Sequence, residues 1–223
     1  MSPRVLVYTV SFGDTIPAYV KASVGINKAY CETHGYEFRE FILPTNFPRH
    51  PAWGRVWFLR QQLSTYDYMF YIDGDAFFAD HSRSLSRLIT FMDETPVCGL
   101  FARDQMLANK VFHSEYANAG VFLFSRQHDG PKLADLWWEV PTDDTYDKTL
   151  YDSLRYLSAS DSLYHHPYEQ LALWHLWDRH PMSFRFVKKY NELNGLDGTF
   201  VKHLIKVPDR ERLRIMQNYK KLI

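Results

Sequence analysis

The stretch Tyr68-Met69-Phe70-Tyr71-Ile72-Asp73-Gly74-Asp75 joins an apolar and aromatic run directly to two carboxylates. Such a run predicts a strand that is buried on both faces. In open α/β sheets, ligands bind just beyond the carboxyl ends of the strands, so we expect both aspartates at a binding edge. Gly74 has no Cβ, which lets a phosphate or a ribose approach the backbone closely. An ordinary polar turn is the simpler alternative, because Asp and Gly are common in turns.

Predicted strands and helices alternate around this stretch. Ahead of it we expect a strand at 5–10, a helix from near Pro17 to a left-handed cap at Gly35, a strand at 36–43 and a helix at 53–66. Asp14 is expected to cap the first helix. Beyond it we expect helices at 85–92, 131–140, 171–177 and 210–221, and strands at 97–102, 120–124, 184–187 and 200–205. This order favours parallel strands with right-handed crossovers, within a single α/β domain over 1–223.

The composition excludes several classes of protein. Lys plus Arg and Asp plus Glu both number 26 among 223 residues, so the formal charge is zero and no nucleic-acid partner is expected. Cys31 and Cys98 are too few for a disulfide framework or a zinc site. The sequence shows no signal peptide and no apolar run of membrane-spanning length. We therefore expect a soluble, cytoplasmic protein, or a fragment of a longer polypeptide with further domains.

The aspartate pair is a candidate site for a hard divalent cation. Mg²⁺ and Mn²⁺ prefer oxygen ligands and often bind one or two carboxylates while substrate phosphates complete their coordination. The pair therefore suggests a metal-bound nucleotide. The base and ribose of that nucleotide are expected after the first strand, which makes Thr9, Ser11 and Phe12 the candidate contacts.

Several blocks of the sequence, in a fixed order, resemble one family of enzymes. They are His50-Pro51-Ala52-Trp53-Gly54-Arg55, Tyr71-Ile72-Asp73-Gly74-Asp75, Asn118-Ala119-Gly120-Val121-Phe122-Leu123, Tyr168-Glu169-Gln170-Leu171-Ala172-Leu173 and Phe200-Val201-Lys202-His203. The set resembles the GT-A glycosyltransferases that carry an Asp-x-Asp motif, most closely the retaining galactosyl- and xylosyltransferases of glycosyltransferase family 34. Two features depart from that family: we expect no membrane anchor in this chain, and Leu204-Ile205-Lys206 stands where small residues usually follow the histidine.

The resemblance implies a GT-A fold, which is Rossmann-like, with a central mixed, mostly parallel sheet flanked by helices. It also implies the transfer of a sugar from a UDP-linked donor to a glycan hydroxyl, with Mn²⁺ or Mg²⁺ as cofactor and with retention of anomeric configuration. Glucose, galactose, xylose and rhamnose all stay open as the transferred sugar. We expect residues 1–105 to bind the nucleotide, and residues 106–223 to bind the acceptor and to supply a metal-binding histidine.

That histidine is His203, which the resemblance makes the third metal ligand. A partly buried structural histidine on a strand is the alternative. A departing nucleoside diphosphate carries concentrated negative charge, so Arg55, Arg60 and Lys206 are candidate diphosphate contacts. Their alternative is ordinary surface solvation, which is the simpler interpretation of Arg60.

The resemblance also implies residues that face the donor sugar. Asn118 and Gly120 match the Asn-x-Gly segment of the family, although alone they are typical of a turn entering a strand. Glu169 and Gln170 are implied to lie beside the anomeric carbon. Without the resemblance, Glu169 is an acid at a helix start, where the helix dipole favours it.

Two other functional classes compete with sugar transfer. A phosphohydrolase of the haloacid-dehalogenase type also places two aspartates after a strand. Its pattern, however, has Gly after the second Asp of the first strand, whereas here Gly74 lies between the acids and Ala76 follows them. A sugar- or nucleotide-binding module, or an inactive transferase relative, keeps the aromatic residues but does not need a complete metal site.

Overall fold

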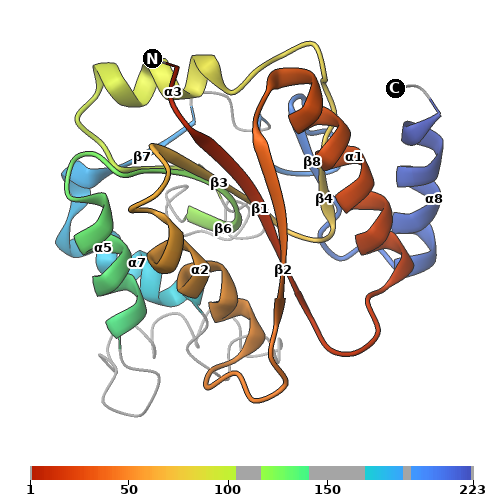
Figure 1. The fold of residues 1–223 in the computed structure, drawn as a ribbon, viewed down its shortest axis with the longest axis horizontal. Helices are drawn as coiled ribbons and strands as arrows, with labels where there is room; N and C mark the ends of the chain where they lie inside the picture. The colour runs from red at the N-terminus through yellow and green to blue at the C-terminus, as the bar shows by residue number, and fades with distance from the viewer. Residues whose placement is uncertain (1, 104–116, 141–168, 188–191, 222–223) are drawn as a thin grey trace, which may run out of the picture.

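A computed structural model describes residues 2–103, 117–140, 169–187 and 192–221 of this chain. Its centre is a six-stranded sheet in the order β2-β1-β3-β6-β5-β7 (Figure 1). The strands are β1 (Val5–Phe12), β2 (Glu37–Leu43), β3 (Tyr68–Ile72), β5 (Gly99–Arg103), β6 (Ala117–Ser125) and β7 (Phe184–Phe186). β1 pairs in parallel with β2 and β3, and β5 pairs in parallel with β7, whereas β6 is antiparallel to both its neighbours. The predicted α/β fold with a mixed, mostly parallel sheet is confirmed.

Helices cover both faces of this sheet. They are α1 (Ala18–His34), α2 (Gly54–Gln62), α3 (Ser86–Glu94), α5 (Gly130–Glu139) and α7 (Glu169–Arg179), with short 3₁₀ turns η1 (Pro51–Trp53) and η3 (Pro181–Ser183). On one face Val7 of β1 shares a buried cluster with residues of α1 and α3. On the other face Tyr8 shares a cluster with residues of α2, α5 and α7. Successive side chains of a strand point to opposite faces, so β1 contributes to both layers.

A second, two-stranded sheet lies beside the first and was not predicted as such. β4 (Ala76–Phe78) pairs antiparallel with β8 (Val201–His203). The last helix, α8 (Asp209–Lys220), packs along α1 at the edge of the molecule (Figure 1). Ile26 of α1, Phe77 of β4 and Met216 of α8 form a small buried cluster there. This cluster fixes the C-terminal part of the chain next to the residues that follow β3.

Several predicted boundaries differ from the structure. β1 continues to Phe12, so Ser11 and Phe12 belong to the strand and not to the loop. The helix predicted at 53–66 begins at Gly54 and already ends at Gln62. Gly35 has φ 68° and caps α1 in the left-handed conformation, as predicted. The expectation that Asp14 caps α1 is wrong, because the N-cap is Pro17 and no side chain bonds there.

Other expectations concern residues that the structure does not describe. The boundary between the nucleotide-binding and acceptor-binding halves at 105–106 lies outside the described ranges, as does Tyr168. Among the described helices, none combines the length and the apolar character that a membrane crossing requires.

Candidate functional site

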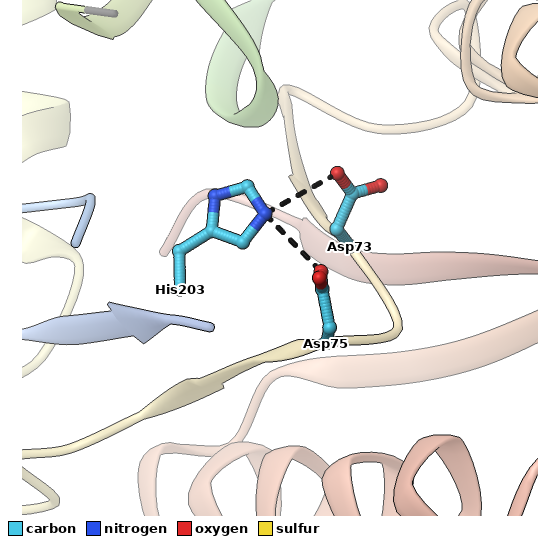
Figure 2. A group of neighbouring side chains, drawn as sticks. All are labelled: Asp73, Asp75 and His203. Carbon is cyan, nitrogen blue, oxygen red and sulfur yellow. Dashed lines mark ion pairs between the residues drawn. The ribbon is translucent and has the colours of Figure 1, made fainter. Parts of the chain in front are cut away.

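Asp73, Asp75 and His203 meet at one point, although 128 positions separate Asp75 from His203 in the chain. β3 delivers the aspartates at its carboxyl end, and the β4–β8 pairing sets Ala76 opposite His203. His203 Nε2 lies 3.1 Å from Asp75 Oδ1 and 3.5 Å from Asp73 Oδ2 (Figure 2). One ligand atom from each of the three residues lies within 4.8 Å of the others. Two carboxylate oxygens and an imidazole nitrogen fit Mn²⁺ or Mg²⁺, so this group is a candidate metal site.

Asn194 holds His203 in the orientation that metal binding needs. Its Oδ1 lies 3.0 Å from His203 Nδ1 and also accepts a hydrogen bond from the Gly195 backbone N–H. Because a carbonyl oxygen only accepts, Nδ1 carries a proton, and Nε2 is the ring atom that can bind either a second proton or a cation beside the aspartates. Burial lowers the pKa of His203, but Asp75 and Asp73 outweigh it and raise that pKa, so a cation competes with a proton here. No sequence motif indicated Asn194.

Asp73 presents only one carboxylate oxygen to the candidate metal site, because its other oxygen already has hydrogen-bonding and ion-pair partners. Oδ1 accepts a hydrogen bond of 2.5 Å from the Tyr71 hydroxyl and pairs with Arg55 Nη2 at 3.0 Å. Oδ2 is the oxygen that faces His203. Burial raises the pKa of Asp73 above its usual value, although Arg55 opposes that rise. The Asp73 backbone N–H donates to the Gly120 carbonyl, which fixes the turn after β3.

Arg55, predicted as a diphosphate contact, links two carboxylates, and 12% of its side chain is exposed. Its Nη1 lies 3.2 Å from Glu169 Oε1 and donates to the Ala119 carbonyl at 2.7 Å, while Nη2 holds Asp73. Burial alone lowers the pKa of Arg55, but Asp73 and Glu169 raise it beyond its usual range, so the guanidinium stays charged. Arg55 therefore fixes the relative positions of the aspartate pair and Glu169.

The residues that the family resemblance places near the donor sugar lie in the first turn of α7 and at the start of β6. Glu169 is 4% exposed, burial raises its pKa, and its Oε2 has no hydrogen-bond partner among the described residues. Gln170 Oε1 accepts a hydrogen bond from the Ala119 N–H, and Asn118 Oδ1 accepts one from the Gly120 N–H. Asn118 and Gln170 thus both hold the start of β6, where it passes the aspartates.

A cavity of about 350 Å³ opens next to the aspartate pair. It is lined by Val10, Ser11, Phe12, Ile16, Pro17, Tyr19, Val20, Asp73, Gly74 and Asp75. Phe12 is 47% exposed, and the Ser11 hydroxyl donates to Glu40 Oε1. Thr9, the third predicted nucleotide contact, is buried and does not line this cavity. Ser11 and Phe12 therefore lie beside the aspartates, whereas Thr9 points into the protein.

A second cationic side chain next to the aspartates, besides Arg55, is Arg212, which no sequence motif indicated. Arg212 Nη2, on α8, lies 2.9 Å from Asp75 Oδ2. Burial raises the pKa of Asp75, but His203 and Arg212 outweigh burial and hold it below its usual value. Arg60, by contrast, pairs with Asp135 of α5, and its contacts do not connect it to the site. Lys206 is exposed just after β8, with φ 60°.

Gly120 leaves the space into which His203 and Asp73 point. A Cβ at this position would lie 2.3 Å from His203 Cε1 and 2.6 Å from Asp73 Oδ2, far closer than atoms pack. Asn194 already holds His203, so the ring cannot move without losing that bond. We expect Gly120→Ala to weaken Mn²⁺ binding roughly tenfold to a hundredfold in calorimetry, the usual cost of disturbing the surroundings of metal ligands.

Gly25, inside α1, offers the matched control. Among the described residues outside the backbone of α1, only Lys220 Nζ lies within 4 Å of a Cβ placed there, at 3.7 Å. We expect Gly25→Ala to leave Mn²⁺ affinity unchanged and to stabilise the fold by about 0.5–1 kcal/mol, because alanine is favoured over glycine in helices. Equal Mn²⁺ affinities in both variants would show that Gly120 does not shape a metal site.

Comparison with known proteins assigns this chain to a family. A family model described as the galactosyl transferase GMA12/MNN10 family matches residues 2–189. A glycosyltransferase involved in the glycosylation of the major capsid of PBCV-1 is similar in structure, with a TM-score of 0.69 at 16% identity, over 97% of this chain and 100% of that chain. The comparison with curated proteins found no match.

Two further solved structures share the fold. The galactosyltransferase LgtC, solved in complex with donor and acceptor sugar analogs, has a TM-score of 0.56 at 12% identity, over 98% of this chain and 96% of that chain. Mouse xyloside xylosyltransferase 1 has a TM-score of 0.51 at 10% identity, over 92% of this chain and 99% of that chain. At such identities these likenesses establish the fold, which is that of the GT-A glycosyltransferases.

Proposed function

This chain belongs to the galactosyl transferase GMA12/MNN10 family and is a glycosyltransferase, and we propose that it transfers a sugar from a UDP-linked donor to a glycan hydroxyl. The observation that carries this proposal is the Asp73, Asp75 and His203 group at the edge of the 350 Å³ cavity. The family match removes the phosphohydrolase alternative. We propose one domain for both substrates, with the nucleotide bound mainly by residues 1–105 and the acceptor by residues 106–223.

The cavity suits a nucleoside next to a diphosphate. The half-exposed Phe12 ring offers a flat apolar surface on which a base can stack, and Tyr19 lies in the same wall. Ser11 provides a hydroxyl in that wall. Gly74 lies between the aspartates, where a side chain would crowd the approach of a ribose or phosphate.

Asp73 Oδ2, Asp75 Oδ1 and His203 Nε2 are the atoms that would hold the divalent cation. When bound, such an ion supplies positive charge that stabilises a departing diphosphate. The protein prepares this site in advance. Arg55 and Tyr71 occupy the other oxygen of Asp73, and Asn194 sets the tautomer of His203. Preorganised groups of this kind cost no reorganisation at the moment of reaction.

Glu169 is the residue that we assign to the anomeric centre. Arg55 holds its Oε1, while Oε2 is buried and has no hydrogen-bond partner in the described part of the chain. In our proposal, Oε2 stabilises the positive charge that develops on the sugar ring, on the face opposite the acceptor. This role agrees with retention of configuration, which needs a carboxylate on the donor's far face.

A thermal-shift panel of nucleotides tests the donor assignment. A ligand that binds only the native state stabilises it by about 2.7 kcal/mol at a hundred times its Kd, which raises Tm by roughly 5–10 °C in a domain of this size. We expect UDP, and one UDP-sugar above the others, to give this shift with Mn²⁺ and a much smaller one without it. A shift with GDP and none with UDP would overturn the nucleotide assignment, and binding without sugar transfer would indicate an inactive relative.

A further inference from the structure

Arg212 is held firmly beside the candidate metal site. Its Nη2 pairs with Asp75 at 2.9 Å, its Nη1 pairs with Asp209 at 3.1 Å, and its Nε donates to the Leu204 carbonyl. Its guanidinium carbon lies 5.0 Å from the centre of the Tyr19 ring. Asp75 and Tyr19 both line the cavity, so Arg212 stands directly behind the cavity wall. Arg212 lies beyond residue 189, where the match to the family model ends.

The charges around the site are nearly balanced before any ligand binds. The carboxylates of Asp73, Asp75 and Glu169 face the guanidiniums of Arg55 and Arg212. Three negative charges against two positive charges leave one net negative charge when His203 is neutral. Asp209, the other partner of Arg212, is 71% exposed, so water screens its charge and it is left out of this count. A divalent cation alone would reverse the sign of this charge, in a place where water screens poorly. A divalent cation that arrives together with a donor diphosphate brings offsetting charges, so the site keeps the net charge that it had before binding.

We propose that Arg212 makes the binding of the divalent cation and of the donor diphosphate depend on each other. This inference rests on the proposed function. Arg212 compensates Asp75, so it opposes a cation that binds there alone. The same positive charge attracts the diphosphate of a nucleotide in the adjoining cavity. Arg212 therefore selects the complex of cation and nucleoside diphosphate over either partner alone, which is a coupling between two ligands.

Calorimetry on Arg212→Gln tests this coupling, because the variant removes the charge and keeps a polar side chain. We expect Mn²⁺ without nucleotide to bind about tenfold more tightly, and UDP with saturating Mn²⁺ to bind about tenfold more weakly, within the usual 5- to 150-fold range of ligand coupling. The two affinities are expected to change in opposite directions, and this decides the test, because simple structural damage would weaken the binding of both Mn²⁺ and UDP. Arg212→Lys keeps the charge and should behave like the unchanged protein.

Arg214→Gln is the matched control on the same helix. Arg214 is exposed and pairs with Glu211, one turn earlier, at 2.5 Å. We expect both affinities to stay unchanged in this variant. If Arg212→Gln weakens both ligands, strengthens both or changes neither, the proposal is wrong. It is also wrong if Arg212→Lys loses the coupling as fully as the Gln variant. If the unchanged protein binds no UDP in the presence of Mn²⁺, the proposed function itself fails.

Discussion

Replacing Asp75 with asparagine is expected to lower the rate of sugar transfer at least about a hundredfold, the scale on which lost electrostatic stabilisation usually appears. The change removes the negative charge that faces His203 Nε2 at 3.1 Å, while the shape of the side chain is kept. Asp75 lies at the cavity wall and outside the apolar clusters, so the fold should persist. Initial rates with saturating donor and Mn²⁺ measure the loss, and circular dichroism checks the fold.

Asp135→Asn is the control for this experiment. Asp135 is also paired with an arginine, Arg60, but on α5 and away from the aspartate pair. This variant should transfer sugar at the normal rate. Near-normal activity of the Asp75 variant, or of the unchanged protein in excess EDTA, would refute the metal assignment.

Glu169→Gln is expected to lose most transfer activity, by roughly a hundredfold to a thousandfold, and to keep its affinity for UDP. Glutamine can still accept the hydrogen bond from Arg55, so the link between Arg55 and Asp73 should survive. Its neutral amide cannot stabilise a positive charge on the sugar. Transfer rates and UDP calorimetry on the same preparation separate the two effects. Full activity would leave Glu169 with only a structural role at the start of α7.

The stereochemistry of the product tests the retaining part of this assignment. Proton NMR of the first product should show the anomeric configuration of the donor. An inverted linkage would require a general base within hydrogen-bond reach of the acceptor hydroxyl, and Glu169 would be the leading candidate. Retention together with an inactive Gln variant supports a carboxylate on the far face of the donor.

The central strand and the aspartate pair were predictable because their signals are local. β3 begins at Tyr68 and ends at Ile72, as expected from an apolar run that needs both faces covered. The left-handed cap at Gly35 follows from the conformational freedom of glycine. The short strands β4 and β8 gave weaker signals, since three residues are too few to show a period.

His203 was reached through a family resemblance and not through a pattern. A lone histidine on a short strand is typical of ordinary structure as much as of a metal site. Only the pairing of β4 with β8 sets it opposite the residue that follows Asp75. Asn194, which orients its ring, had no sequence signal at all.

The sequence by itself determined the α/β layout, through periodicity and turn chemistry, and it located two carboxylates at the end of a buried strand. Tertiary structure alone decided which arginine side chains pair with these carboxylates. Arg55, predicted as a diphosphate contact, pairs with both Asp73 and Glu169, which lie far from it in the sequence. Arg212, from the last helix, reaches Asp75 because α8 packs on α1. The partner of a charged side chain depends on how distant elements pack, and no local period of the sequence encodes that contact.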